Sequence, residues 1–129
     1  METERPCLLL VDDDAQVREI AGALLQEEGY SVRLFPGAAA AWEALDAGLA
    51  AAALLVDVAM PGMSGTDLVR QVQARWPRLP VIFLTGDPES AARGGQGPAD
   101  SAIFVLQKPY RLQELLGVVS RAIRAGEGG

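Results

Sequence analysis

Histidine is absent from the 129-residue sequence, and cysteine and lysine occur once each, as Cys7 and Lys108. Without histidine and with one cysteine, the chain lacks the nitrogen and sulfur ligands of the usual zinc sites. A single cysteine cannot form an internal disulfide, and Cys7 lies in an apolar run, so we expect a reduced, buried thiol. These absences argue against a zinc centre and favour a cytoplasmic protein.

Long hydrophobic runs are also missing. The longest apolar run extends from Leu49 to Val56, well short of the roughly 18 to 20 residues needed to cross a bilayer, and no signal segment begins the chain. The formal charge of −6 and the pI near 4.5 oppose nonspecific binding to a polyanion. We therefore expect neither membrane insertion nor direct binding of nucleic acid.

Short apolar runs alternate with segments of helical period, which predicts the α/β class with a parallel sheet covered on both faces. A composition that is 50% apolar can supply the core of one domain of this length. Residues 1–129 are expected to form a single domain, with a core from about 6 to 124 and a frayed tail at 125–129. The predicted strands are 7–11, 31–35, 52–56, 80–84 and 102–106.

Helices are expected between most of these strands and at the end of the chain. The first is ended by Gly29, the second carries Trp42, the third is opened by Ser64 and closed by Pro77, and the last spans 111–124. The segment 89–100, ESAARGGQGPAD, contains three glycines and a proline. Because these residues disfavour helix, we expect only a short or loose helix there.

Polar side chains follow four of the predicted strands. They are Asp12, Asp13 and Asp14; Asp57; Thr85 and Gly86; Gln107 and Lys108. In an open parallel sheet, ligands bind beyond the carboxyl ends of the strands. If the first and third strands are neighbours, at least three carboxylates meet there, and a cation would offset their repulsion. Oxygen ligands of this kind suit Mg²⁺.

Asp57 is then a candidate nucleophile toward phosphorus, because carboxylates can form aspartyl phosphates beside a metal ion. Lys108 offers a compact positive charge to a phosphoryl group, Thr85 offers a hydroxyl donor, and Gly86 leaves room. Asp14 is expected to cap the following helix and not to bind the cation.

The stretches LLLVDDD, LLVDVAMPGMSG, VIFLTG and LQKPY occur in this order at spacings close to those of the receiver domain of two-component response regulators. The chain resembles that family from about Cys7 to Ile123. The resemblance implies a flavodoxin-like, doubly wound, five-stranded parallel sheet of order 2-1-3-4-5 in a three-layer α/β/α arrangement. It also implies a signalling domain that catalyses only its own phosphorylation and dephosphorylation.

In this family a phosphohistidine on a histidine kinase or phosphotransfer protein donates a phosphoryl group in a Mg²⁺-dependent reaction. By matching position, the resemblance makes Asp57 the acceptor and Asp12 and Asp13 the acidic pair. The three aspartates would hold Mg²⁺ together with the backbone carbonyl of Ala59.

The resemblance also makes Thr85 the switch hydroxyl and Lys108 the lysine of the site, with a cis bond to Pro109. Gly86 and Asp87 are expected to modulate the reaction. Asp87, two residues after the threonine, would orient or repel the attacking water and so set the lifetime of the phosphoryl group.

Two features depart from the family pattern. Val105 stands three residues before the lysine, where many receivers carry an aromatic switch residue, and the stretch from Thr85 to Lys108 is one residue longer than expected. Similar loose segments occur in receivers of hybrid sensor kinases, so the chain is either such a receiver or a free-standing relative. We expect no output region beyond Gly129 and therefore expect the signal to be read through contact with a downstream protein, by a monomer or a weak phosphorylation-dependent dimer.

Three other functions belong to different classes. A phosphatase of the haloacid dehalogenase type needs a second acid where this chain has Ala59, and a flavodoxin-like cofactor binder needs a Ser/Thr/Gly-rich loop where this chain has DDDA. A phosphorylation-independent, receiver-like scaffold stays open, and the dependence of partner binding on Asp57 would distinguish it.

Overall fold

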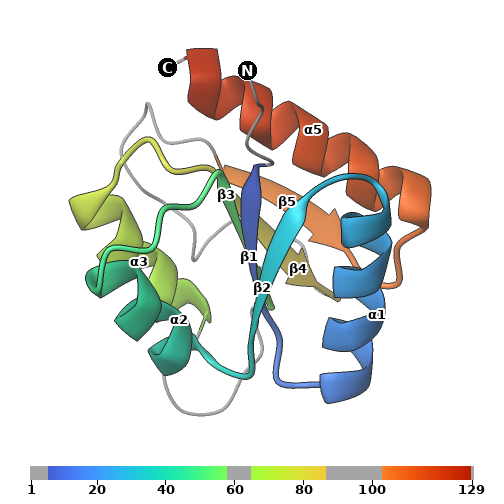
Figure 1. Ribbon diagram of the computed structural model, residues 1–129, viewed down its shortest axis with the longest axis horizontal. Coiled ribbons are helices and arrows are strands. Elements are labelled where there is room, and N and C mark those ends of the chain that lie inside the picture. The colour runs from blue at the N-terminus through green and yellow to red at the C-terminus, as the bar shows by residue number, and fades with distance from the viewer. Residues whose placement is uncertain (1–5, 58–64, 87–102, 129) are drawn as a thin grey trace.

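The computed structural model describes residues 6–57, 65–86 and 103–128. Its strands are β1 (Cys7–Val11), β2 (Ser31–Phe35), β3 (Ala53–Asp57), β4 (Val81–Thr85) and β5 (Ile103–Gln107). All neighbouring strands are parallel, and the sheet has the order β2-β1-β3-β4-β5. The α/β class and the expected strand order are confirmed (Figure 1).

Helices cover both faces of the sheet. They are α1 (Ala15–Glu27), α2 (Ala38–Asp46), α3 (Gly65–Arg75) and α5 (Leu112–Gly128). Helices α1 and α5 lie on one face, and α2 and α3 lie on the other (Figure 1). The glycine-rich segment 89–100 lies outside the described residues. Within the described part of the chain, every helix is too short or too polar to span a bilayer.

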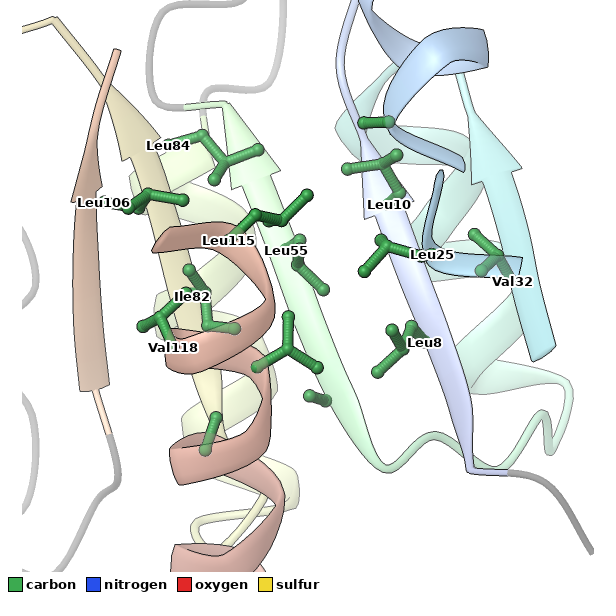
Figure 2. Packing of buried hydrophobic residues seen from close by; sticks show 14 residues of the cluster. Leu8, Leu10, Leu25, Val32, Leu55, Ile82, Leu84, Leu106, Leu115 and Val118 are labelled. Atoms are coloured by element: carbon green, nitrogen blue, oxygen red, sulfur yellow. The ribbon is translucent and has the colours of Figure 1, made fainter. Parts of the chain in front are cut away.

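The core is divided by the sheet, because successive side chains of a strand point to opposite faces. On β1, Leu8 and Leu10 face α1 and α5, whereas Leu9 and Val11 face α2 and α3. Figure 2 shows the first of these two clusters, in which leucines of β1 and β3 meet residues of α1 and α5. Burial on both faces explains why the strand sequences read as nearly continuous apolar runs.

The first helix begins and ends at the residues that the sequence predicts. Asp14 is the N-cap of α1, and its Oδ1 accepts hydrogen bonds from the N–H groups of Gln16 and Val17 at 3.0 and 3.1 Å. After the helix, Gly29 has a φ of 102°, and the Tyr30 N–H donates to the Leu25 carbonyl at 3.2 Å. A left-handed residue at this position favours glycine, which therefore terminates the helix.

Four elements differ from the prediction in their boundaries. Strands β3, β4 and β5 each lie one residue later, so Asp57 and Thr85 are the last residues of their strands and do not follow them. The backbone ladder continues through these polar residues, since Asp57 pairs with Leu84 and Thr85 pairs with Gln107. The prediction of a frayed tail from residue 125 is wrong as far as Gly128, because α5 continues to that residue.

The two tryptophans, Trp42 in α2 and Trp76 directly after α3, lie together. The ring centroids of Trp42 and Trp76 are 5.9 Å apart, and the guanidinium carbon of Arg75 lies 4.5 Å from the Trp76 centroid. Arg75 also pairs with Asp46. Trp76 and Cys7 line one open cavity, which places the cluster at the edge of the sheet where β1 begins. Arg75 therefore links the two helices.

Gly22 on α1 allows the helix to approach β2 closely. A Cβ at this position would lie 2.8 Å from Cδ2 of Leu34, a side chain that is 39% exposed and can move outward. Alanine removes the roughly 0.5–1 kcal/mol cost of glycine in a helix interior. Moving Leu34 aside should offset part of this gain. We therefore expect Gly22→Ala to raise the free energy of unfolding in urea by about 0.5 kcal/mol.

Gly117→Ala is the matched control, because a Cβ there meets only Arg121 Nη1 at an ordinary 3.7 Å. This variant should show the whole gain from helix propensity. A loss above about 1 kcal/mol in Gly22→Ala alone would mean that Leu34 cannot move aside.

Candidate functional site

The predicted site residues meet at one edge of the sheet. Asp12 follows β1, Asp57 ends β3, Thr85 ends β4 and Lys108 follows β5. Because all five strands run in the same direction (Figure 1), these positions share the carboxyl edge. In this strand order the crevice lies between β1 and β3, where the chain reverses its direction of travel across the sheet.

Asp12, Asp13 and Asp57 form an acidic cluster, with one carboxylate oxygen of each within 4.8 Å of the others. Asp12 is fully buried, Asp57 is 7% exposed and Asp13 lies at the surface. Like charges this close repel one another unless a cation offsets them. The oxygen donors fit a hard divalent cation such as Mg²⁺, and the sequence without histidine does not fit the usual zinc sites.

Lys108 supplies the positive charge inside this cluster. Its Nζ lies 3.2 Å from Asp12 Oδ2 and 3.3 Å from Asp57 Oδ2, and its side chain is 28% exposed. Burial by itself lowers the pKa of Lys108, but the charges of Asp12 and Asp57 and the hydrogen bonds to both outweigh it, so the pKa is raised. The amine is therefore protonated throughout the neutral range.

Asp12 is held from several directions. Its N–H donates to the Phe35 carbonyl at 3.2 Å, and its Oδ1 accepts from the Asp14 N–H at 2.9 Å. Its backbone carbonyl accepts from Nη1 of Arg18 at 2.6 Å. The sequence prediction did not include Arg18. The available signal was a cation within one helical turn of an acidic strand end, which many unrelated helices also contain.

Thr85 is 6% exposed, and its carbonyl accepts a hydrogen bond from the Lys108 N–H at 2.7 Å. This bond ties the end of β4 to the residue that carries the site cation. Gly86 is exposed, and a Cβ there would meet no atom of the described structure within 4 Å. Ala59 and Asp87 lie outside the described residues, so their predicted roles stay predictions.

Residues around Lys108 complete the edge. The Lys108–Pro109 peptide bond is cis, as the resemblance implies. Tyr110 packs against the core beside α5, and burial raises the pKa of its hydroxyl, while the charge of Lys108 opposes the rise. Val105, at the position of the usual aromatic residue, is 36% exposed, whereas Phe104 packs against the core on the opposite face.

Comparison with known sequences gives a consistent result. A profile of the family described as response regulator receiver domain matches residues 8–120. The chain is 35% identical over 122 residues to the DNA-binding transcriptional regulator NtrC of Escherichia coli K12, covering 93% of this chain and 25% of NtrC. It is 30% identical over 125 residues to the transcriptional regulatory protein FixJ of Bradyrhizobium diazoefficiens, covering 97% of this chain and 60% of FixJ. The chain thus spans 60% or less of the length of these two relatives.

Solved structures show the same likeness. The signal receiver domain of an HD domain-containing protein from Pseudomonas fluorescens Pf-5 has a TM-score of 0.83 at 26% identity, covering 98% of this chain and 100% of that chain. The chemotaxis protein CheY4 of Vibrio cholerae has a TM-score of 0.77 at 26% identity, covering 92% of this chain and 99% of that chain. Both matches extend over nearly the whole fold.

Proposed function

Because the chain belongs to the response regulator receiver domain family of two-component systems, we propose that Asp57 accepts a phosphoryl group from a phosphohistidine on a histidine kinase or phosphotransfer protein. The supporting observation is the position of the buried Asp57 carboxylate, 3.3 Å from Lys108 and within the acidic cluster. The domain would act as a cytoplasmic signalling module that catalyses only its own phosphorylation and dephosphorylation.

In the transfer step, a carboxylate oxygen of Asp57 attacks phosphorus, an oxygen–phosphorus bond forms, and the phosphorus–nitrogen bond to the donor histidine breaks. The histidine nitrogen keeps the electron pair of that bond. Lys108 offsets the negative charge of the incoming group, since its amine is already held between Asp12 and Asp57. The rigid end of a buried strand keeps the nucleophile in place.

Asp12, Asp13 and Asp57, with the carbonyl of Ala59, would hold Mg²⁺ at this edge. When bound, the ion supplies positive charge that offsets the repulsion between phosphoryl oxygens and the carboxylates. Asp12 and Asp57 are buried and Asp13 is exposed, so the cluster has one side open to solvent. The donor and the ion can both approach from that side.

The phosphoryl group would act as a switch by drawing the hydroxyl of Thr85 and the amine of Lys108 toward it. The hydrogen bond from the Lys108 N–H to the Thr85 carbonyl couples the two positions. Their movement would shift the loops after β4 and β5 and change a contact with a downstream protein. DNA binding is named for the whole of NtrC, of which this chain matches a quarter, and is not part of the proposal.

The test is intact mass after incubation with acetyl phosphate, with Mg²⁺ or with a chelator. We expect a gain of one phosphoryl group that requires Mg²⁺ and is removed by hydroxylamine, as an acyl phosphate is. If no gain occurs under any condition and BeF₃⁻ also fails to bind, the phosphoacceptor function is wrong and a phosphorylation-independent scaffold takes its place.

A further inference from the structure

We propose that Arg18 of α1 is a positioning residue that holds the backbone of the acidic pair in the geometry that binds the cation. The inference rests on the function proposed above, because it concerns the same Mg²⁺ site. It adds a residue from a helix to a site otherwise built from strand ends.

Arg18 forms a hydrogen bond at each end of the acidic loop, residues 12–14. Its own N–H donates to the Asp14 carbonyl at 2.9 Å, in the first turn of α1. Its half-buried side chain reaches back, and Nη1 donates to the Asp12 carbonyl at 2.6 Å. Residues 12–14 are thus joined to the helix at their first and last carbonyl groups.

A hydrogen bond to the Asp12 carbonyl affects how the backbone presents the next residue, Asp13. The Asp12 N–H still donates to Phe35 of β2 at 3.2 Å, but the chain leaves the sheet at this residue. The carbonyl belongs to the peptide unit that also carries the nitrogen of Asp13. Fixing this unit therefore fixes the direction in which the backbone presents Asp13, while the Asp12 carboxylate is held by the Asp14 N–H and Lys108.

Loss of the charge of Arg18 and loss of its hydrogen bond should change the affinity for Mg²⁺ in opposite directions. A guanidinium bonded to the Asp12 carbonyl repels a second cation at this edge, so removal of the charge alone would tighten Mg²⁺ binding. Loss of the hydrogen bond frees the peptide unit and would weaken binding. Groups that orient metal ligands typically change metal affinity by about 10–100-fold when they are removed.

The experiment is calorimetric titration of the wild-type chain and its variants with MgCl₂, well below their melting temperatures. We expect Arg18→Met to raise the Kd for Mg²⁺ about tenfold or more. Arg124→Met is the matched control, because Arg124 donates a hydrogen bond to Ser120 within its own helix, α5, and its loss removes the same charge. This control should bind Mg²⁺ within about twofold of the wild type.

Amide hydrogen exchange without Mg²⁺ provides a second readout. The Asp14 amide, which donates to Asp12 Oδ1, should exchange faster in Arg18→Met and not in Arg124→Met. If Arg18→Met does not fold, Arg18→Lys decides, because it keeps the charge but not the reach of the guanidinium. It should raise the Kd at least about threefold.

An unchanged or lower Kd in folded Arg18→Met, or a wild-type Kd in Arg18→Lys, would overturn the positioning role while leaving the proposed function intact. A wild-type chain that binds no Mg²⁺ would overturn both, and the titration distinguishes these two results.

Discussion

Asp57→Asn is expected to gain no phosphoryl group from acetyl phosphate under conditions that fully modify the wild-type chain. An amide has no free carboxylate oxygen with which to attack phosphorus, so the loss should be complete and not partial. Asp57 is 7% exposed and adjoins Lys108, and among the acids of the described residues it alone is the last residue of a strand, whereas the buried Asp12 follows β1. Intact mass followed by peptide mapping measures the result.

Asp67→Asn is the matched control for this variant. Asp67 lies exposed in the first turn of α3 and pairs with Arg70 at 3.9 Å, so its replacement makes the same change of charge away from the acidic cluster. It should accept the phosphoryl group like the wild type. A phosphoryl gain in Asp57→Asn equal to that of Asp67→Asn would show that another residue is the acceptor.

Replacing Asp57 should not unfold the chain. Without Mg²⁺, the three carboxylates of the cluster lie close together, and the amine of Lys108 contacts those of Asp12 and Asp57. Removing one negative charge reduces their mutual repulsion, so Asp57→Asn should be at least as stable as the wild type in chelator. A circular dichroism melt therefore separates lost chemistry from lost structure.

Lys108→Met is expected to destabilise the chain most strongly when Mg²⁺ is absent. Removing one partner of a buried ion pair costs about 3–5 kcal/mol. Since the Lys108 side chain is 28% exposed, we expect roughly 1–3 kcal/mol in urea unfolding. Saturating Mg²⁺ should recover much of this loss, because it supplies positive charge to the same carboxylates. A loss below about 0.5 kcal/mol in chelator would contradict the pairing seen here.

The contribution of Lys108 to the stability of the folded chain changes with pH in a definite direction. The pKa of Lys108 is raised in the folded chain above the ordinary value of 10.5, so its contribution to stability is fully present below that pH. The contribution is lost as the pH rises through the folded-state pKa. Lys108→Arg keeps its charge at higher pH and should lose less stability than the wild type in the same alkaline range.

The residues of the site could be predicted because they occupy strand ends. Asp57, Thr85 and Lys108 each stop or follow an apolar run, and parallel strands bring such positions to one edge. The predicted boundaries of β3, β4 and β5 are one residue early, because the pattern of apolar side chains does not show that the backbone ladder continues through Asp57 and Thr85. Side-chain composition and backbone pairing are separate properties.

Contacts across helices could not be predicted in the same way. Arg18 reaches the Asp12 carbonyl only because the chain turns sharply between β1 and α1. Arg75 bonds Asp46 and lies over Trp76 because α2 packs against α3. Neither contact follows from periodicity, which gives the buried face of each helix but not the partner of a polar side chain at its margin.

The pairing of Trp42 with Trp76 determines what optical measurements on this chain can report. These are its two tryptophans, and both lie in the layer of α2 and α3 near the start of β1. Intrinsic fluorescence is therefore a probe of the seam between these two helices, at the edge of the sheet away from the acidic cluster. A titration with Mg²⁺ that leaves the emission unchanged would therefore not argue against binding. A change in emission would show that binding at one edge of the sheet alters the contact between α2 and α3 at the other edge.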